Sequence, residues 1–288
     1  MAKPKVLVLG SSGCLGSALI NELSLNGNPY AATYNLQSFQ SAANLYKFTV
    51  GDDLSSLLKE VNPDIIVNCI VLKKGSLTSP NSYVQLFRIN TLFPHQLAQL
   101  SSSFDIPLIN ISTDAVFYGV KGSYKEKSLT IPGSIYALSK RLGESKLKKI
   151  HNIRLSFVPK DFNNAKKYNT LKWLIDASEI SPAIGFENHL WNGLTDEVAA
   201  KLLSSIINNK SLLSDLPTTL HLFSRKAISK FELAELILNQ YSLPINNIVK
   251  INALNSKNLT LSSSYADYLL QLWATLGFET IPNFEDLF

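Results

Sequence analysis

The fold is decided by Lys5-Val-Leu-Val-Leu9, Gly10-Ser11-Ser12-Gly13-Cys14-Leu15-Gly16 and Ser17-Ala-Leu-Ile-Asn-Glu-Leu-Ser-Leu25, which follow one another without a break. The first run is apolar after its lysine, which predicts a parallel strand buried on both faces. The last run has the spacing of an amphipathic helix. A strand, a glycine turn and a helix in this order are typical of a dinucleotide site, because a pyrophosphate can bind the free N–H groups of the helix N-terminus.

The glycine turn supplies the first predicted cofactor-binding residues. Its spacing is Gly-x-x-Gly-x-x-Gly rather than the usual Gly-x-Gly-x-x-Gly, so a plain strand-to-helix turn stays open on this motif alone. On the dinucleotide interpretation, the glycines permit a tight turn and a close approach of the backbone to the ligand. The predicted residues are Gly10, Ser12, Gly13, Cys14, Leu15 and Gly16.

Further apolar runs predict the other strands of the sheet. They cover residues 30–34, 48–52, 64–71, 106–111 and 153–158. Helical patterns lie between them, at 53–61, at 83–101 and around Tyr136. Strands that alternate with helices over about 155 residues predict an α/β fold with a doubly wound parallel (Rossmann) sheet.

The rest of the chain predicts a smaller C-terminal α/β substrate lobe over the carboxyl edge of the sheet, where ligands bind in such folds. Helices are expected at 170–178, 196–208 with Thr195 as cap, 229–241 and 261–277. Residues 1–158 are expected to form the dinucleotide-binding domain, with 190–225 packing back on it. Residues 159–189 and 226–288 are expected to form the substrate-binding lobe.

Tyr136 and Lys140 are the candidates for proton transfer. They lie four residues apart in a predicted helix, so they share one face. A nearby cation lowers the pKa of a tyrosine from its usual value of about 10, so Lys140 is expected to make Tyr136 a usable acid. Thr113 follows a predicted strand and could hydrogen-bond the same substrate carbonyl. The alternative for the pair is a half-buried aromatic beside a solvated amine.

Two polar residues near the ends of predicted strands extend the cofactor site. Asp52 is a candidate partner for an adenine amino group, with a helix cap as the alternative, and Asn68 must find a partner in an apolar run. Residues 35–37 lack the carboxylate that usually holds a ribose 2′-hydroxyl. This favours NADP(H), while the lack of a nearby arginine leaves NAD(H) open.

Composition excludes several classes of protein. The chain has 288 residues, of which 45% are hydrophobic and 17% charged, so it is globular rather than disordered. Its net charge of +5 suits a nucleotide diphosphate. The sequence lacks a dense basic stripe with interleaved aromatics, so nucleic-acid binding is not expected. Cys14 and Cys69 provide neither a disulfide framework nor a zinc spacing, and no metal site is expected. The apolar start is too short to span a membrane, so a cytoplasmic protein is expected.

Several motifs together resemble the extended short-chain dehydrogenase/reductases. The matching residues are Gly10-x-x-Gly13-x-x-Gly16, Gly51-Asp52, Asn68, Ser112-Thr113-Asp114-Ala-Val-Phe117-x-Gly119, Tyr136-Ala-x-Ser-Lys140 and Leu142-Gly143-Glu144. The Ser-Thr-Asp-x-Val-Phe-x-Gly stretch is similar to that of the dTDP-4-dehydrorhamnose reductase (RmlD-like) branch. The resemblance covers roughly residues 1–160 well and the rest loosely.

This resemblance implies NADP(H)- or NAD(H)-dependent reduction of a 4-keto-6-deoxy sugar carried on a nucleoside diphosphate, in deoxysugar or surface polysaccharide biosynthesis. Tyr136 would protonate the ketone oxygen, Lys140 would lower the tyrosine pKa and hold the nicotinamide ribose, and Thr113 would fix the carbonyl. Tyr136 and Lys140 are both expected among the cofactor-binding residues. Phe117, Phe157 and Trp191 are the expected substrate-binding residues. A homodimer is left open.

Three segments depart from the family pattern, all on the sugar-nucleotide side. Arg154 is followed by Leu-Ser-Phe where the family usually has Thr-Ser-Trp, and 72–76 and 256–262 also differ. The loop Trp191-Asn192-Gly193 is a candidate replacement, with an aromatic packing a turn as the alternative. A sugar-nucleotide epimerase or dehydratase on the same scaffold and a non-catalytic NADP-binding regulatory subunit are the alternative functions.

Overall fold

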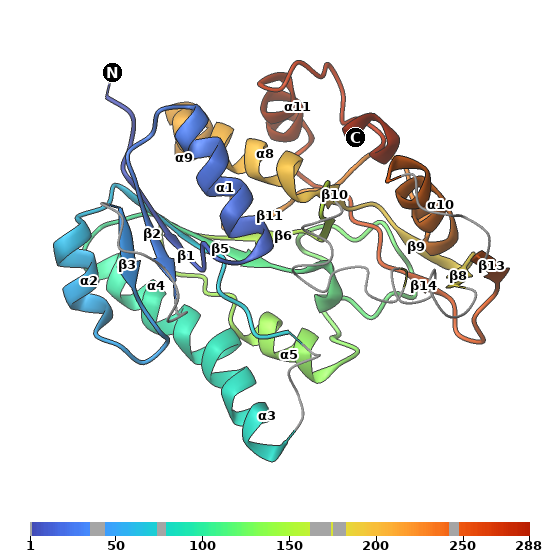
Figure 1. Ribbon diagram of the computed structural model, residues 1–288, viewed down its shortest axis with the longest axis horizontal. Coiled ribbons are helices and arrows are strands. Elements are labelled where there is room, and N and C mark those ends of the chain that lie inside the picture. The colour runs from blue at the N-terminus through green and yellow to red at the C-terminus, as the bar shows by residue number, and fades with distance from the viewer. Residues whose placement is uncertain (1, 35–43, 74–78, 162–173, 175–182, 242–247) are drawn as a thin grey trace.

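A sheet of seven parallel strands crosses the centre of the molecule in the order β11-β6-β5-β4-β1-β2-β3 (Figure 1). The computed structural model describes residues 2–34, 44–73, 79–161, 174, 183–241 and 248–288. The strand order reverses between β1 and β4, as in a doubly wound fold, which confirms the predicted fold class. The strands are β1 (Val6–Leu9), β2 (Tyr30–Tyr34), β3 (Leu45–Lys47), β4 (Ile65–Asn68), β5 (Leu108–Ser112), β6 (Ile150–Arg154) and β11 (Thr219–His221).

Helices cover both faces of this sheet (Figure 1). On one face lie α1 (Cys14–Leu25), α8 (Asp196–Asn208) and α9 (Lys210–Ser214). On the other face lie α2 (Leu54–Val61), α3 (Pro80–Phe87), a π-helical turn (Arg88–Leu92), α4 (Phe93–Ser103) and α5 (Ile135–Leu142). Because successive strand residues point to opposite faces, β1 supplies Val6 and Val8 to the core under α1 and α8, and Leu7 and Leu9 to the core under α2 and α4.

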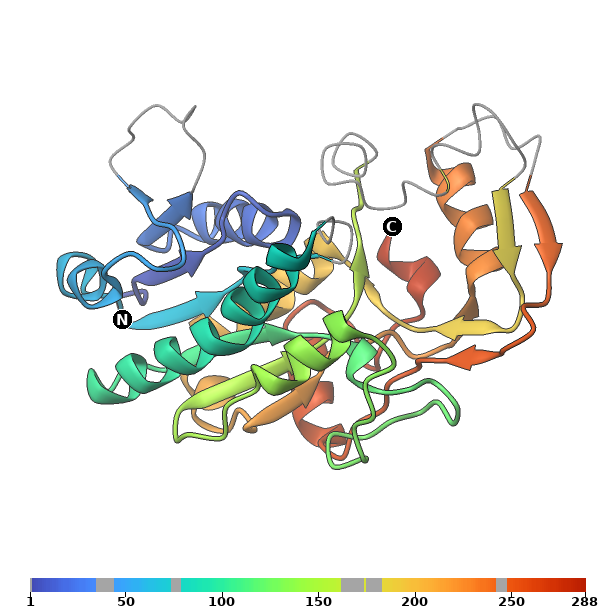
Figure 2. The same ribbon diagram turned by 90° about the horizontal axis from the view of Figure 1, so that it is seen from below.

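The C-terminal part of the chain adds three small sheets, which Figure 2 shows beside the large one. They pair β7 (Phe157–Val158) with β10 (Leu194–Thr195), β9 (His189–Trp191) with β12 (Ile228–Ser229) and β14 (Lys257–Asn258), and β8 (Ala183–Phe186) with β13 (Ile248–Ile251). The remaining elements are α10 (Lys230–Gln240), α11 (Ala266–Ala274) and the 3₁₀ turns Asp114–Val116 and Phe284–Leu287.

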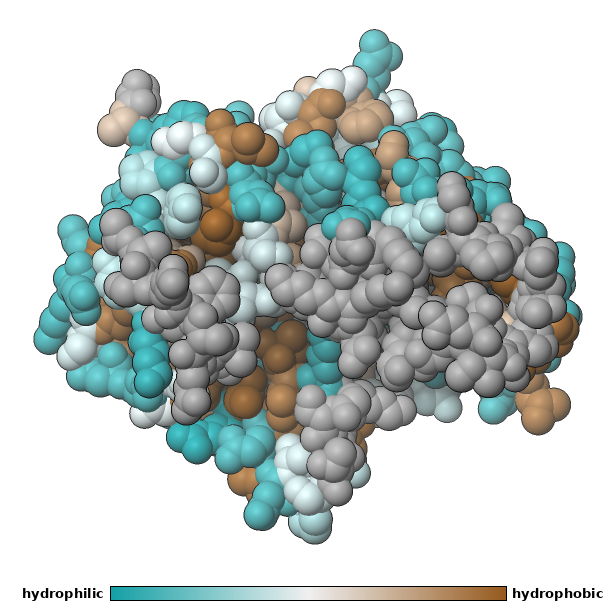
Figure 3. Space-filling model, viewed as in Figure 1, coloured by the Kyte–Doolittle hydropathy of each residue, from teal (hydrophilic) through white to brown (hydrophobic). Residues whose placement is uncertain are grey.

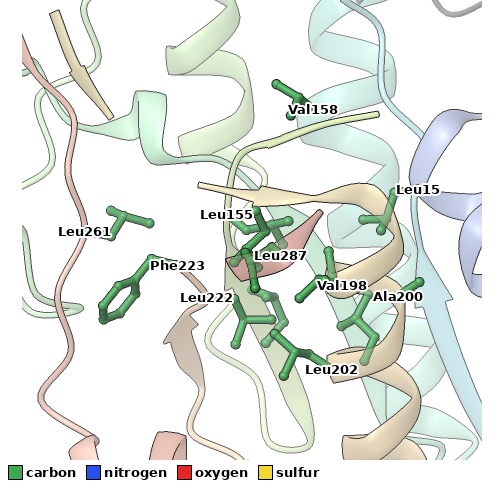
Figure 4. Close-up of a cluster of buried hydrophobic side chains, with 14 of the residues drawn as sticks. Leu15, Leu155, Val158, Val198, Ala200, Leu202, Leu222, Phe223, Leu261 and Leu287 are labelled. Carbon is green, nitrogen blue, oxygen red and sulfur yellow. The ribbon is translucent and has the colours of Figure 1, made fainter. Parts of the chain in front are cut away.

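One apolar cluster joins the C-terminal part to the large sheet. Figure 4 shows Leu15 of α1, Val198 of α8, Leu155 after β6 and Leu287 near the C-terminus in the same cluster of buried side chains. Each is almost fully removed from water. In addition, β11 pairs with β6 at the edge of the sheet. The domain boundaries expected from the sequence remain a prediction.

Several predicted element boundaries are wrong. The third strand was expected at 48–52, but this segment turns: Gly51 has φ of 118°, and the Asp52 N–H donates to the Thr49 carbonyl at 2.9 Å. The expected strand 153–158 is divided between β6 and β7, which lie in different sheets. The expected loop around Trp191 contains β9 and β10, and the last helix begins at Ala266. The expected helix at 170–178, apart from Leu174, and residues 35–37 lie outside the described residues.

Three buried asparagines form a ladder across β4, β5 and β6. Asn68, Asn110 and Asn152 are register partners in neighbouring strands. The Asn68 amide nitrogen donates to Asn110 Oδ1 at 2.9 Å, and that of Asn110 donates to Asn152 Oδ1 at 3.2 Å. Asn152 in turn donates to the Ser145 carbonyl at 2.7 Å. The buried amides thereby satisfy one another, as polar groups in a protein interior must.

A buried ion pair connects the ends of β5, α5 and β6. The Arg154 guanidinium donates to both Glu144 oxygens, at 2.8 and 2.7 Å, and each side chain is only 4% exposed. Ser112, the last residue of β5, donates to Glu144 Oε1 at 2.7 Å. Two charges removed from water in this way depend on each other for solvation.

Replacing Glu144 with Gln should lower the free energy of unfolding by about 3–5 kcal/mol, because Arg154 would stay charged and uncompensated in the interior. Urea unfolding followed by circular dichroism measures this loss. The control is Lys149→Gln, which breaks an ion pair with the exposed Asp105. Solvent screens that pair, so the control should leave the unfolding midpoint nearly unchanged. A Glu144→Gln midpoint equal to that of the wild type would contradict the prediction.

Candidate functional site

The glycine turn folds tightly against itself at the carboxyl end of β1. Gly10 has φ of 79°, and the Gly13 N–H donates to the Gly10 carbonyl at 3.0 Å. A Cβ on Gly16 would overlap the Gly10 carbonyl oxygen, so only glycine fits there. Gly13 is the N-cap of α1 and supplies no capping side chain, and the first helical turn has no acidic residue. The first N–H groups of α1 are therefore suited to an anion.

The other predicted residues of the turn contribute differently. The Cys14 thiol donates to the buried carboxylate of Asp196 at 3.1 Å, so this side chain is engaged within the protein. Leu15 packs its side chain into the core. Ser12 is half-buried in the turn. The cofactor-binding role of these residues stays a prediction.

The end of β4 adjoins the turn, because Leu9 and Asn68 are register partners. A Cβ on Gly10 would approach the backbone nitrogen of Ile70 to 2.9 Å. The Asn68 amide is already engaged: its nitrogen donates to Asn110 and its oxygen accepts from the Ile70 N–H at 3.1 Å. The partner expected for Asn68 is thus found within the protein, and its contact with a cofactor stays a prediction.

Helix α5 presents Tyr136 and Lys140. Ser134 caps the helix by accepting from the Ala137 N–H at 3.1 Å. The Lys140 ammonium is buried and donates to the Ile111 carbonyl of β5 at 2.7 Å, so it lies at the carboxyl end of the sheet. Asn90, in the π-helical turn, donates to Ser139 Oγ at 3.1 Å and supports the helix from behind.

Burial lowers the pKa of Lys140 to about 8, although the nearby charges of Glu144 and Cys69 act in the opposite direction. The expectation that Lys140 lowers the pKa of Tyr136 is wrong for this structure. Burial raises the pKa of Tyr136 to about 12, and the negative charge of Asp114 adds to the rise. The sequence shows that Lys140 lies at helical spacing from Tyr136, but burial and the Asp114 carboxylate decide the direction in which the tyrosine pKa shifts.

Asp114 is the site residue that the sequence reasoning missed. It is buried directly after Thr113, and its Oδ1 accepts from the Thr113 hydroxyl at 3.1 Å. Its Oδ2 accepts from Ser156 Oγ at 2.5 Å, and the Trp191 indole N–H donates to the same Ser156 oxygen at 2.5 Å. Burial raises the pKa of Asp114 above its usual range. The signal in the sequence that could have indicated Asp114 is its carboxyl group next to Thr113 in the Ser-Thr-Asp motif.

The predicted substrate-binding aromatics are not equivalent. Phe117 is 2% exposed: its ring stacks on Tyr124 at 4.3 Å, and Arg154 lies 5.3 Å from its centre. This packing corrects the expectation for Phe117, because the ring has almost no surface left for a substrate. Phe157 and Trp191 are half-buried, and Trp191 also packs edge-on against Phe284. Their substrate roles stay predictions.

A hollow of about 1010 Å³ lies beside Asp52 rather than beside Tyr136. In the view shared by Figures 1 and 3, hydrophobic surface lies low in the picture, over the region of α3 and α4. Val84 and Phe87 line the hollow together with Arg88, whose guanidinium would overlap a Cβ on Gly51. The structure therefore brings an arginine to the segment Gly51-Asp52, although none lies nearby in the sequence. Asp53, not Asp52, caps α2.

Within the described ranges, no three His, Cys, Asp or Glu side chains are grouped so that they could hold a metal ion. Among the helices of those ranges, none combines the length and the apolar character that crossing a membrane requires.

Comparisons with known proteins identify a family and a fold that this chain resembles. The family described as "RmlD substrate binding domain" matches residues 4–268. A relative from Haloferax volcanii, "Probable low-salt glycan biosynthesis reductase Agl14", is 29% identical over 158 residues, which cover 52% of this chain and 52% of that protein. The chain thus spans about half the length of this relative.

Two other matches extend over more of the chain. "Methionine adenosyltransferase 2 subunit beta" of Rattus norvegicus is 22% identical over 92% of this chain and 82% of that protein. The crystal structure of dTDP-4-dehydrorhamnose reductase from Bacillus anthracis in complex with NADP has a TM-score of 0.76 at 21% identity. It covers 99% of this chain and 96% of that chain, and it shows the likeness of fold.

Replacing Gly16 with Ala should displace the glycine turn, because the new Cβ overlaps the Gly10 carbonyl. The overpacking should cost about 1–3 kcal/mol of unfolding free energy and shift the backbone amide NMR signals of residues 10–16. Gly133→Ala is the matched control, since its Cβ would approach Tyr118 only to 3.4 Å. Unchanged amide signals in the Gly16 variant would show that the turn tolerates a side chain.

Proposed function

The chain belongs to the RmlD substrate binding domain family, and from this premise we propose that it reduces a 4-keto-6-deoxy sugar carried on a nucleoside diphosphate, with NADPH preferred and NADH accepted. One observation carries the proposal. Lys140 of α5 donates to Ile111 at the end of β5, β5 pairs with β4, and the segment that follows β4 lies against Gly10. The glycine turn and the predicted proton-transfer helix thus adjoin at one edge of the sheet, where ligands bind in such folds.

The residues of the turn fit a dinucleotide. A Cβ on Gly10 or on Gly16 would overlap neighbouring backbone atoms, so the turn is as tight as a dinucleotide site requires. The N-terminus of α1 has no side-chain cap at Gly13 and no acidic residue in its first turn, so its dipole favours a pyrophosphate. Asp52 and Arg88 are proposed to face the adenosine end, where the guanidinium favours the 2′-phosphate of NADP(H). When bound, the reduced nicotinamide supplies the hydride.

The proposed chemistry of the chain's own residues is proton transfer and orientation. The Tyr136 hydroxyl gives its proton to the ketone oxygen as negative charge develops there. A pKa of about 12 keeps this phenol protonated at neutral pH, so the proton is present when needed. Lys140, with a pKa of about 8, is mostly charged at neutral pH and holds the nicotinamide ribose. The Thr113 hydroxyl donates to the same ketone oxygen and fixes its direction.

A second candidate function is a non-catalytic, NADP-binding regulatory subunit. The observation in its favour is the match to methionine adenosyltransferase 2 subunit beta over 92% of this chain. The rise in the pKa of Tyr136 is also compatible with a residue that transfers no proton. Against it, Thr113, Tyr136 and Lys140 are all present, and a protein that only binds would not need the three together.

A panel of nucleoside-diphosphate 4-keto sugars, each with NADPH and with NADH, separates the two functions. Oxidation of the nicotinamide, followed by its absorbance, supports the reductase and names the sugar and the cofactor. Binding of NADPH without oxidation on any member of the panel supports the regulatory subunit.

Tyr136→Phe should lower kcat by about 10²–10⁴-fold, because the proton donor is removed while the ring is kept. NADPH affinity, measured by fluorescence titration, should stay within about twofold, since the ring and Lys140 are both retained. An equal loss of turnover and of affinity would instead indicate a structural role.

Lys140→Ala should weaken NADPH binding as well as turnover, because one ammonium serves both. The same titration and the same assay measure the two effects. Lys146→Ala is the matched control: its side chain is exposed in the loop that follows α5, and both values should be unchanged. Normal NADPH affinity in the Lys140 variant would contradict the proposed contact between Lys140 and the nicotinamide ribose.

A further inference from the structure

The Thr113 hydroxyl has a single hydrogen, and this fact constrains the site. Its oxygen accepts from the Ala115 N–H at 3.2 Å and lies 3.1 Å from Asp114 Oδ1. If Asp114 is ionised, the hydrogen of Thr113 must point at the carboxylate, because an ionised carboxylate can only accept. Thr113 then has nothing to donate to a substrate ketone.

The other Asp114 oxygen is held by a chain of donors. The Trp191 indole N–H can only donate, so Ser156 Oγ must accept from it at 2.5 Å. Ser156 then directs its own hydrogen to Asp114 Oδ2, at 2.5 Å. Because Oδ2 accepts in this arrangement, a proton on Asp114 is placed on Oδ1, the oxygen that faces Thr113.

We propose that Asp114 is a positioning residue that acts in its neutral form, donating from Oδ1 to Thr113 Oγ and so releasing the Thr113 hydrogen for the substrate ketone. The inference rests on the proposed reduction and adds a named role within it. With Asp114 neutral, Thr113 accepts from Ala115 and Asp114 and donates once, which uses all of its capacity. Trp191 and Ser156 hold the acid in the required direction.

The surroundings of Asp114 favour the neutral form. The group is buried, and burial is the largest influence on its pKa, in the upward direction. Its charge reaches two titratable groups on other elements, Tyr136 of α5 and Lys230 of α10. Lys230 favours an ionised Asp114, but burial outweighs the hydrogen bonds that lower the pKa of the carboxyl group. A neutral Asp114 also removes the negative charge that opposes ionisation of Tyr136.

Asp114→Asn tests the proposal, because an amide donates from nitrogen to Thr113 and accepts from Ser156 at oxygen, as the neutral acid does. This variant should keep kcat within about fivefold, whereas Thr113→Val should lose about 10²–10³-fold as an oxyanion donor is removed. As pH rises, the wild type should lose turnover in two steps, for Asp114 and for Lys140. Asp114→Asn should show the Lys140 step alone.

The matched control is Asp105→Asn, which changes an exposed carboxylate that pairs with Lys149 and should leave both steps in place. Ser156→Ala should lower turnover, because the carboxyl group loses the donor that sets its direction, and Trp191→Phe should do so more weakly. Loss of turnover in Asp114→Asn as large as in Thr113→Val, or a pH profile like that of the wild type, would overturn the proposal.

Two measurements need no substrate. Infrared difference spectra of wild type against Asp114→Asn near neutral pH should show the C=O band of a protonated carboxyl group, and its absence would overturn the proposal. The folded-state pKa of Asp114 is raised, so its favourable contribution is complete below the unfolded pKa and is lost as pH rises through the folded value. Wild type should therefore lose stability relative to Asp114→Asn as pH rises. If no sugar is turned over, the proposed reduction fails while these readouts still report on Asp114.

Discussion

The arrangement of the site depends on the buried ion pair between Arg154 and Glu144. Arg154 ends β6, Glu144 follows α5, and Ser112 at the end of β5 donates to the same carboxylate. Thr113 comes directly after Ser112, and Lys140 lies one turn before Glu144. One charged contact thereby fixes the strand that carries the hydroxyl against the helix that carries the phenol and the ammonium. Neither charge can exchange its partner for water, so the contact holds these elements together.

The electrostatics of the site follow from burial more than from pairing. Lys140 loses affinity for its proton because it is buried, and Tyr136 holds its proton more firmly for the same reason. Asp114 is buried as well, and burial raises its pKa, while its negative charge adds to the rise in the pKa of Tyr136. In the proposed reduction, a protonated phenol and a charged lysine suit the delivery of a proton rather than its removal.

Periodicity and glycine spacing were sufficient for the parts of the fold that depend on local sequence. The strand, glycine turn and helix at the N-terminus, the helix of Tyr136, and α8 with its Thr195 cap all follow from patterns within about one turn or strand. The third strand was misplaced because Phe48-Thr-Val suits a strand, while the turn at Gly51 prevents one. Phe117 was misjudged because the rings that enclose it, Tyr124 and His221, are placed by tertiary contacts. The burial and hydrogen bonding of Asp114 could not be predicted, because Ser156, which donates to its carboxylate, is 42 residues away in the sequence.

The asparagine ladder has a consequence for how the central strands assemble. A slip of β5 by one residue would turn Asn110 to the other face of the sheet and set aliphatic side chains between Asn68 and Asn152. Each amide stranded in this way would cost about 1–3 kcal/mol. Strands with only aliphatic side chains would tolerate such a shift more easily, because valine, isoleucine and leucine have similar size and need no specific partner. The ladder therefore specifies the register of the three central strands more sharply than aliphatic packing would.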